Sequence, residues 1–92
     1  MSQYIVLAKF TDEGVKNMKE FPRQMEAADQ KAKAAGLKVT RYFTLGEYDI
    51  VVLVEAPSDE VLARVAVGIS SQGHVRLQTM RAFTQAEFLK MV

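Results

Sequence analysis

The chain has 92 residues, of which 49% are hydrophobic and 25% are charged, and its 12 basic and 11 acidic side chains leave a net charge of +1. This length suits one domain, and so small a charge argues against nucleic acid or an anionic membrane surface as a partner. We therefore expect a single domain over residues 1–92. The chain has no cysteine and one histidine, His74. These counts exclude a disulfide framework, a thiolate zinc site and a multi-histidine metal site within one chain, and we expect no cofactor.

The first expected element is a strand over residues 4–10, which are rich in β-branched and aromatic side chains. Its apolar run is too short for the core of a signal peptide, and no basic region precedes it. No stretch of the sequence approaches the ~20 apolar residues of a membrane helix. We therefore expect a soluble, cytoplasmic protein with no membrane partner.

Helical periodicity follows this strand, with apolar residues at steps of three and four and Thr11 placed to cap the start. Pro22 lies within the pattern, and proline suits the first turn of a helix but not its interior. The sequence therefore predicts a short helix over about residues 12–19, a break, and a main helix over about residues 21–35 that ends at Gly36.

The second half of the chain repeats the order of strand and helix. Residues 38–45 and 50–55 are predicted strands joined by a tight turn. Ser58 is the predicted N-cap of a helix with one apolar face, and residues 75–82 form the fourth predicted strand. A capping-box pattern that starts at Thr84 predicts a short C-terminal helix.

These elements have the order β-α-β-β-α-β with a helical tail, which is the ferredoxin-like pattern of an α+β protein. Right-handed crossovers put the first and third strands in the middle of a four-stranded antiparallel sheet, in the order 4-1-3-2. The composition agrees, because the first strand (YIVLA) and the third (IVVLV) are apolar at every position, whereas the second and fourth carry arginine and threonine.

Two helices can cover only one face of such a sheet, which leaves apolar side chains of the central strands uncovered on the other. The first strand leaves uncovered either Tyr4, Val6 and Ala8 or Ile5 and Leu7. An exposed apolar patch of this size marks an interface, so we predict a homodimer joined through the open sheet face, with a ring of dimers as an extension. The alternative is that the C-terminal helix folds back over this face in the same chain.

The sequence Gly46-Glu47-Tyr48-Asp49, followed by residues 50–57 (IVVLVEAP), resembles the signature of the GYD-domain proteins, a group of small bacterial proteins. The segments YIVLAKFT at residues 4–11 and RAFT at residues 81–84 are similar too. The resemblance covers about residues 3–88. It implies a ferredoxin-like fold and a dimeric α+β barrel, but no assigned biochemical role.

A similar G-x-Y-D turn occurs in the effector-binding domains of Lrp/AsnC-type transcription regulators. There the turn lies near a subunit interface where a small amino acid can bind. The DNA-binding helix-turn-helix half has no counterpart here, because the first predicted strand begins at residue 4. This resemblance implies a stand-alone sensing or oligomerising module.

The G-x-Y-D turn is also the first candidate site. Gly46 can supply a positive φ, the ring of Tyr48 can cover the end of the barrel, and Asp49 can accept backbone N–H bonds within the turn. We favour these structural roles, and direct contact of the three residues with a ligand is the alternative.

Three other residues are candidates for ligand contact. Histidine is the residue type whose ordinary pKa lies nearest neutrality, so His74 is the default general base or haem ligand, although a partly exposed histidine at a strand end is the simpler interpretation. Arg41 lies on an expected edge strand, where arginine discourages edge-to-edge pairing; an anion-binding cleft or an intersubunit salt bridge is the alternative. Its neighbour Tyr42 offers a further polar contact, and Met25 is adaptable filler that leaves room for a pocket between helix and sheet.

The sequence has no phosphate-binding loop and no HExxH, GxSxG or paired-carboxylate motif, so no motif points to one particular reaction. Three hypotheses for the function remain open. We favour a binding or assembly module that holds a small apolar or amphipathic ligand between its helices and sheet. The second hypothesis is a cofactor-independent enzyme resembling the monooxygenases of this fold class, which requires a closed pocket on the order of several hundred Å³ with at least two converging polar groups. Its polar contacts would be Arg41, Tyr42, Tyr48 and His74. The third is a stand-alone effector sensor.

Overall fold

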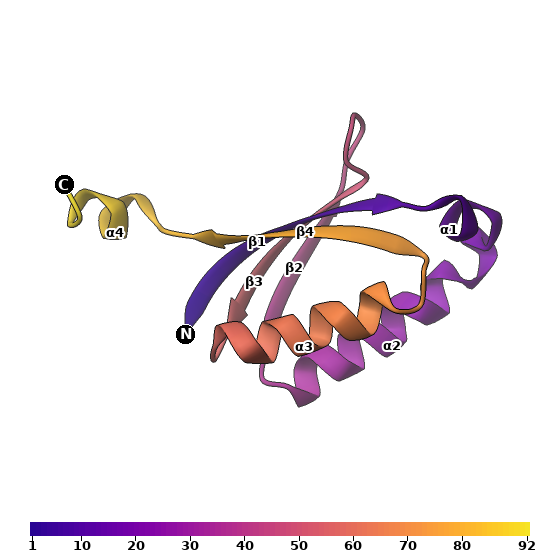
Figure 1. Ribbon diagram of the computed structural model, residues 1–92, viewed down its shortest axis with the longest axis horizontal. Helices are drawn as coiled ribbons and strands as arrows, with labels where there is room; N and C mark the ends of the chain where they lie inside the picture. The colour runs from indigo at the N-terminus through magenta and orange to yellow at the C-terminus, as the bar shows by residue number, and fades with distance from the viewer.

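A four-stranded antiparallel sheet with two long helices on one side makes up the computed structural model, which describes all residues from 1 to 92 (Figure 1). The strands are β1 (Ser2–Phe10), β2 (Lys38–Phe43), β3 (Ile50–Ala56) and β4 (Val75–Ala82). The helices are α1 (Asp12–Lys16), α2 (Phe21–Ala34), α3 (Asp59–Ser70) and α4 (Gln85–Leu89), and a 3-10 turn, η1 (Met18–Glu20), separates α1 from α2. None of these helices has the length and hydrophobicity that crossing a membrane requires.

The strand order is β2-β3-β1-β4, and all neighbouring strands are antiparallel. β1 pairs with β3 from Ser2↔Ala56 to Ala8↔Ile50, and on its other edge it pairs with β4. The two continuously apolar strands therefore lie in the centre of the sheet, as predicted. This order confirms the ferredoxin-like α+β arrangement.

The first helical segment breaks where Pro22 indicated. α1 ends at Lys16 and α2 begins at Phe21, so Pro22 lies in the first turn of α2, where its missing N–H leaves no hydrogen bond unmade. α2 ends at Ala34, and Gly36 follows with a φ of +80°. Glycine adopts this left-handed conformation without the steric cost that a Cβ brings, which makes it the natural residue after a helix.

The helices cover the face of the sheet that carries Tyr4, Val6 and Ala8, whereas Ile5 and Leu7 lie on the other face. The core lies between α2, α3 and the sheet, and most of its side chains are aliphatic. Its buried members are Tyr4, Val6, Ala32, Leu37, Val54, Ala56 and Leu62. One face of the sheet is therefore part of the core, and the other has no helix over it.

β2 ends at Phe43, two residues earlier than the sequence suggested. The cause lies in the hairpin loop. The backbone N–H of Thr44 donates to the carbonyl oxygen of Asp49 at 2.8 Å, and its hydroxyl donates to the carbonyl oxygen of Tyr48 at 2.6 Å. Thr44 therefore closes the loop, and Leu45 is fully exposed beyond it.

The C-terminal helix α4 extends away from the rest of the molecule (Figure 1). Its start is the predicted capping box: Glu87 N–H donates to Thr84 Oγ1 at 3.1 Å, and Thr84 N–H donates to Glu87 Oε1 at 2.9 Å. Its side chains Phe88 and Leu89 are 55% and 57% exposed. The helix does not fold back over the sheet, so the chain leaves its own open face uncovered.

The capping box gives α4 a pH dependence. Hydrogen bonds from Thr84, first from its backbone N–H and then from its hydroxyl, hold the pKa of Glu87 below its ordinary value. A lowered folded-state pKa means that the box stabilises α4 above the ordinary carboxyl pKa and loses this effect as the pH falls through the folded pKa. We expect the Cα chemical shifts of α4 to move toward coil values on acidification, with no such movement in Glu87→Gln. Coil-like shifts of α4 at neutral pH in the unaltered protein would contradict this expectation.

Candidate functional site

The sheet face without helices, called the open face below, has an apolar centre and charged ends. Its centre contains one or two side chains from each strand: Ile5, Leu7, Tyr42, Val51, Leu53 and Met80. Leu53 is 44% and Tyr42 56% exposed, although they lie among other apolar groups. One end of the face carries Lys38 and Glu55, and the other carries Lys9 and Arg76. An apolar centre with a charged rim is the composition of a protein interface.

The G-x-Y-D turn is fastened to the sheet at the end of β1. Asp49 Oδ2 accepts the backbone N–H of Phe10 at 2.8 Å, and the backbone N–H of Asp49 donates to the carbonyl oxygen of Ala8 at 2.9 Å. Gly46 has a φ of +128°, a conformation that other residues rarely adopt. The structure thus gives Gly46 and Asp49 clear structural roles in this turn.

Tyr48 reaches from the same turn to the open face. Its hydroxyl donates to Gln78 Oε1 at 2.8 Å, and Lys9 Nζ lies 5.7 Å from the centre of its ring. Both partners lie on the open face, at the end with Lys9 and Arg76. Tyr48 therefore joins Tyr42 on the surface that the helices do not cover.

His74 lies at the start of β4, where its backbone has a structural role. Its carbonyl oxygen accepts the N–H of Thr11 at 3.1 Å, directly beside Gly14. In its side chain, Nε2 lies 3.4 Å from Gln24 Nε2, and Nδ1 is buried with no hydrogen-bond partner. None of the other candidate residues contacts the imidazole by a hydrogen bond.

Arg41 points to the helix side of the sheet, opposite to its neighbour Tyr42. Its Nη2 lies 3.0 Å from Oδ1 of Asp29 on α2, and its side chain is only 19% exposed. The six candidate residues therefore do not form one site. Gly46, Tyr48 and Asp49 belong to the hairpin turn, whereas Tyr42, Arg41 and His74 lie in three different places.

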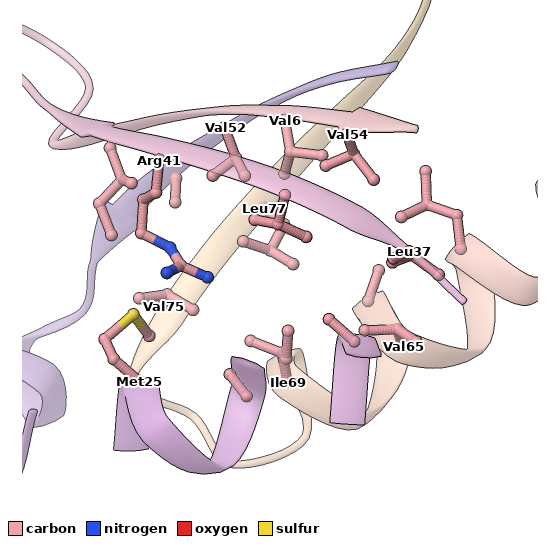
Figure 2. Close-up of a pocket in the computed structure, with 17 residues that line it drawn as sticks. Val6, Met25, Leu37, Arg41, Val52, Val54, Val65, Ile69, Val75 and Leu77 are labelled. Atoms are coloured by element: carbon pink, nitrogen blue, oxygen red, sulfur yellow. The ribbon is translucent and has the colours of Figure 1, made fainter. Parts of the chain in front are cut away.

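An apolar cavity of about 80 Å³ lies between the sheet and helices α2 and α3 (Figure 2). It is lined by 17 residues, of which 16 are hydrophobic, and Arg41 is the exception. The enzyme hypothesis requires a larger pocket with at least two converging polar groups. The cavity has one such group, and Tyr42, Tyr48 and His74 do not line it.

A polar contact that the sequence analysis missed joins β1 to α3. The hydroxyl of the buried Tyr4 donates to Asp59 Oδ1, and this hydrogen bond, followed by burial, raises the pKa of Tyr4. The guanidinium of Arg81 lies 5.5 Å from the ring of Tyr4 and 4.7 Å from that of Phe83. Tyr4 and Asp59 are 55 positions apart in sequence, and no local pattern connects a strand tyrosine with an acidic residue in the first turn of a helix.

Solved structures with this architecture include a de novo designed protein, Ferredog-Diesel. It is 14% identical to this chain, with a TM-score of 0.53 over 88% of this chain and 85% of the designed one. At this identity the likeness concerns the fold alone.

Sequence comparison gives a closer relation. A protein of Thermus thermophilus, named glutamine synthetase and cystathionine beta-lyase binding protein, is 31% identical over 91 residues. These residues span 97% of this chain and 96% of the Thermus protein. The sequence model of the GYD domain matches residues 4–92, which include the Gly46-Glu47-Tyr48-Asp49 turn. The chain therefore belongs to the GYD domain family.

Proposed function

We propose that this protein is a small protein-binding module that assembles as a homodimer through its open face. The observation that carries the proposal is the apolar centre of that face. Burying one such side chain contributes about 1.5–3 kcal/mol, so even three of them per subunit would be comparable with the stability of a small domain, ~5–15 kcal/mol.

A second copy of the chain suits the open face because Glu55 at one end is opposite in charge to Lys9 and Arg76 at the other. If the two sheets pack with their strands antiparallel, Glu55 of one copy lies over the end that carries Lys9 and Arg76 in the other. A two-fold axis repeats this pairing on both sides of the apolar centre. The resulting interface has opposite charges around an apolar core, as stable interfaces do.

The name of the Thermus relative supports protein partners as well. That protein is named for binding glutamine synthetase and cystathionine beta-lyase. Because the two chains align over nearly their whole lengths, we propose that this protein also binds enzymes of that kind. We further propose a bacterial, cytoplasmic setting, and the bacterial source of the relative supports the first part of this.

The dimer is tested by placing a charge in the centre of the open face. We expect Leu53→Arg to weaken self-association by about a hundredfold or more, because a guanidinium would lose its water among apolar side chains. Sedimentation velocity at micromolar concentration measures the change. Val67→Arg is the matched control, since Val67 is 67% exposed on α3, away from the open face. A monomer in the unaltered protein, or equal effects of the two variants, would disprove the proposed interface.

The protein partners are tested separately. The immobilised protein is exposed to purified glutamine synthetase, cystathionine beta-lyase and serum albumin, and binding is followed by biolayer interferometry. We expect binding of at least one of the two enzymes and none of albumin. Absence of binding to both enzymes would overturn this part of the proposal and leave the dimer untouched.

A further inference from the structure

The cavity between the helices and the sheet lies on the opposite side of the sheet from the open face. Its walls are aliphatic, with Val6, Val52 and Val54 from the sheet and Val65 and Ile69 from α3 (Figure 2). Its volume of about 80 Å³ is roughly half that of an engineered apolar cavity that takes benzene, ~150 Å³. The space therefore suits a short branched alkyl group rather than an aromatic ring.

Arg41 brings the only charge to this cavity. In Figure 2 its side chain crosses the space between β2 and Met25 on α2, so the guanidinium lies next to the aliphatic walls. The side chain is 19% exposed, whereas that of its partner Asp29 is 55% exposed. The cation is thus held largely inside the molecule, and its anionic partner stands at the surface.

The ion pair with Asp29 does not use the full binding capacity of the guanidinium. Arg41 has five N–H donors, and Nη2 is the nitrogen within ion-pair distance of a carboxylate. A partly exposed ion pair of this kind contributes little, because water and salt screen it. A carboxylate that meets the guanidinium edge-on makes two parallel hydrogen bonds and is held more strongly.

We propose that this cavity binds a small aliphatic monocarboxylate, with its carboxylate on Arg41 and its branched alkyl group among the valine, leucine and isoleucine side chains. The alkyl group loses contact with water, and the carboxylate completes the hydrogen bonding of a cation that is already largely buried. Asp29 competes with the ligand for Arg41, so the site releases its ligand readily. This site is independent of the homodimer, since it lies on the other side of the sheet.

The probe for the test is 3-methylbutanoate, with 3-methylbutan-1-ol as its uncharged counterpart. Methyl NMR spectra report where each compound binds. We expect the carboxylate to shift methyl signals of the lining residues Val52, Val65 and Ile69 but not that of Leu53 on the open face. The alcohol should bind about tenfold more weakly, because it cannot form the bidentate pair. Equal binding of the two compounds, or shifts confined to the open face, would overturn the proposal.

Two variants assign the carboxylate to Arg41. Arg41→Met keeps an apolar stem and should weaken binding of 3-methylbutanoate about tenfold or more. Arg76→Met is the control: it removes an arginine from the open face and should leave binding of 3-methylbutanoate unchanged. Asp29→Asn removes the competitor and should strengthen binding severalfold. This opposite sign keeps the test decisive even if Arg41→Met folds poorly. Weaker binding in Asp29→Asn, or no change in Arg41→Met, would disprove the role of Arg41. Repeating the titration with the Leu53→Arg variant separates ligand binding from dimer formation.

Discussion

Replacing Gly14 with alanine is expected to lower the free energy of unfolding by about 3 kcal/mol. Gly14 is a buried residue of α1, and a Cβ added to it would overlap the carbonyl oxygen of His74 and lie 3.1 Å from the carbonyl carbon. Those atoms belong to the backbone, so no side-chain rotation relieves the clash. Either α1 or the start of β4 must move.

That movement breaks a junction between the two halves of the chain. The N–H of Thr11 donates to the carbonyl oxygen of His74 at 3.1 Å, and its hydroxyl donates to that of Gly73 at 2.5 Å. Chemical denaturation at equilibrium measures the loss. Gly68→Ala is the control, because a Cβ on Gly68 of α3 meets no atom within 4 Å. That variant should gain up to about 1 kcal/mol from helix propensity. Equal stabilities of the two variants would show that α1 and β4 are not in close contact.

Replacing Asp49 with alanine is expected to cost about 2 kcal/mol, the usual effect of losing a hydrogen bond to a charged group. The N–H of Phe10 would lose its acceptor at the point where β1 leaves the sheet. Asp49→Asn keeps a carbonyl oxygen at the same place and should cost less than about 1 kcal/mol. Urea denaturation distinguishes these outcomes.

Glu47 is the matched control for Asp49, since it is an exposed carboxylate in the same turn. Glu47→Ala should change stability by less than about 0.5 kcal/mol. If Asp49→Ala is as mild as Glu47→Ala, the structural role of the aspartate is wrong. In that case a ligand that raises the melting temperature of the unaltered protein but not of Asp49→Asn would identify the turn as a binding site.

The strand order could be predicted from sequence because each strand has its own composition. The apolar runs of β1 and β3 indicated central strands, and the proline at the start of α2 indicated a break. The face of the sheet that meets the helices was beyond prediction. In β1 both the even-numbered and the odd-numbered positions are apolar. Periodicity therefore does not show whether Tyr4 and Val6 or Ile5 and Leu7 face the helices.

The features of the candidate sites were harder to predict from the sequence than the strand order. In β2, alternate residues share a face of the sheet, so the sequence itself puts Arg41 on the same face as Val39 and Phe43. The ion pair of Arg41 with Asp29 depends on how α2 crosses the sheet, which no local pattern encodes. The same is true of Gly14, whose small size is required by a carbonyl group 60 residues later in the chain. Long-range packing of this kind appears only once the tertiary structure is known.

The central position of β1 also means that its two edges are paired at different times during synthesis. Of the four strands of this sheet, β1 leaves the ribosome first, and one of its edges is closed only by β4 (Val75–Ala82). At about 5–20 residues per second, the interval between the two strands lasts roughly 4–14 s. Throughout this time a nascent chain carries an apolar strand with an unpaired backbone edge, the kind of segment that pairs with other chains. The open edge of β1 is therefore exposed to pairing with other chains until β4 has been synthesised.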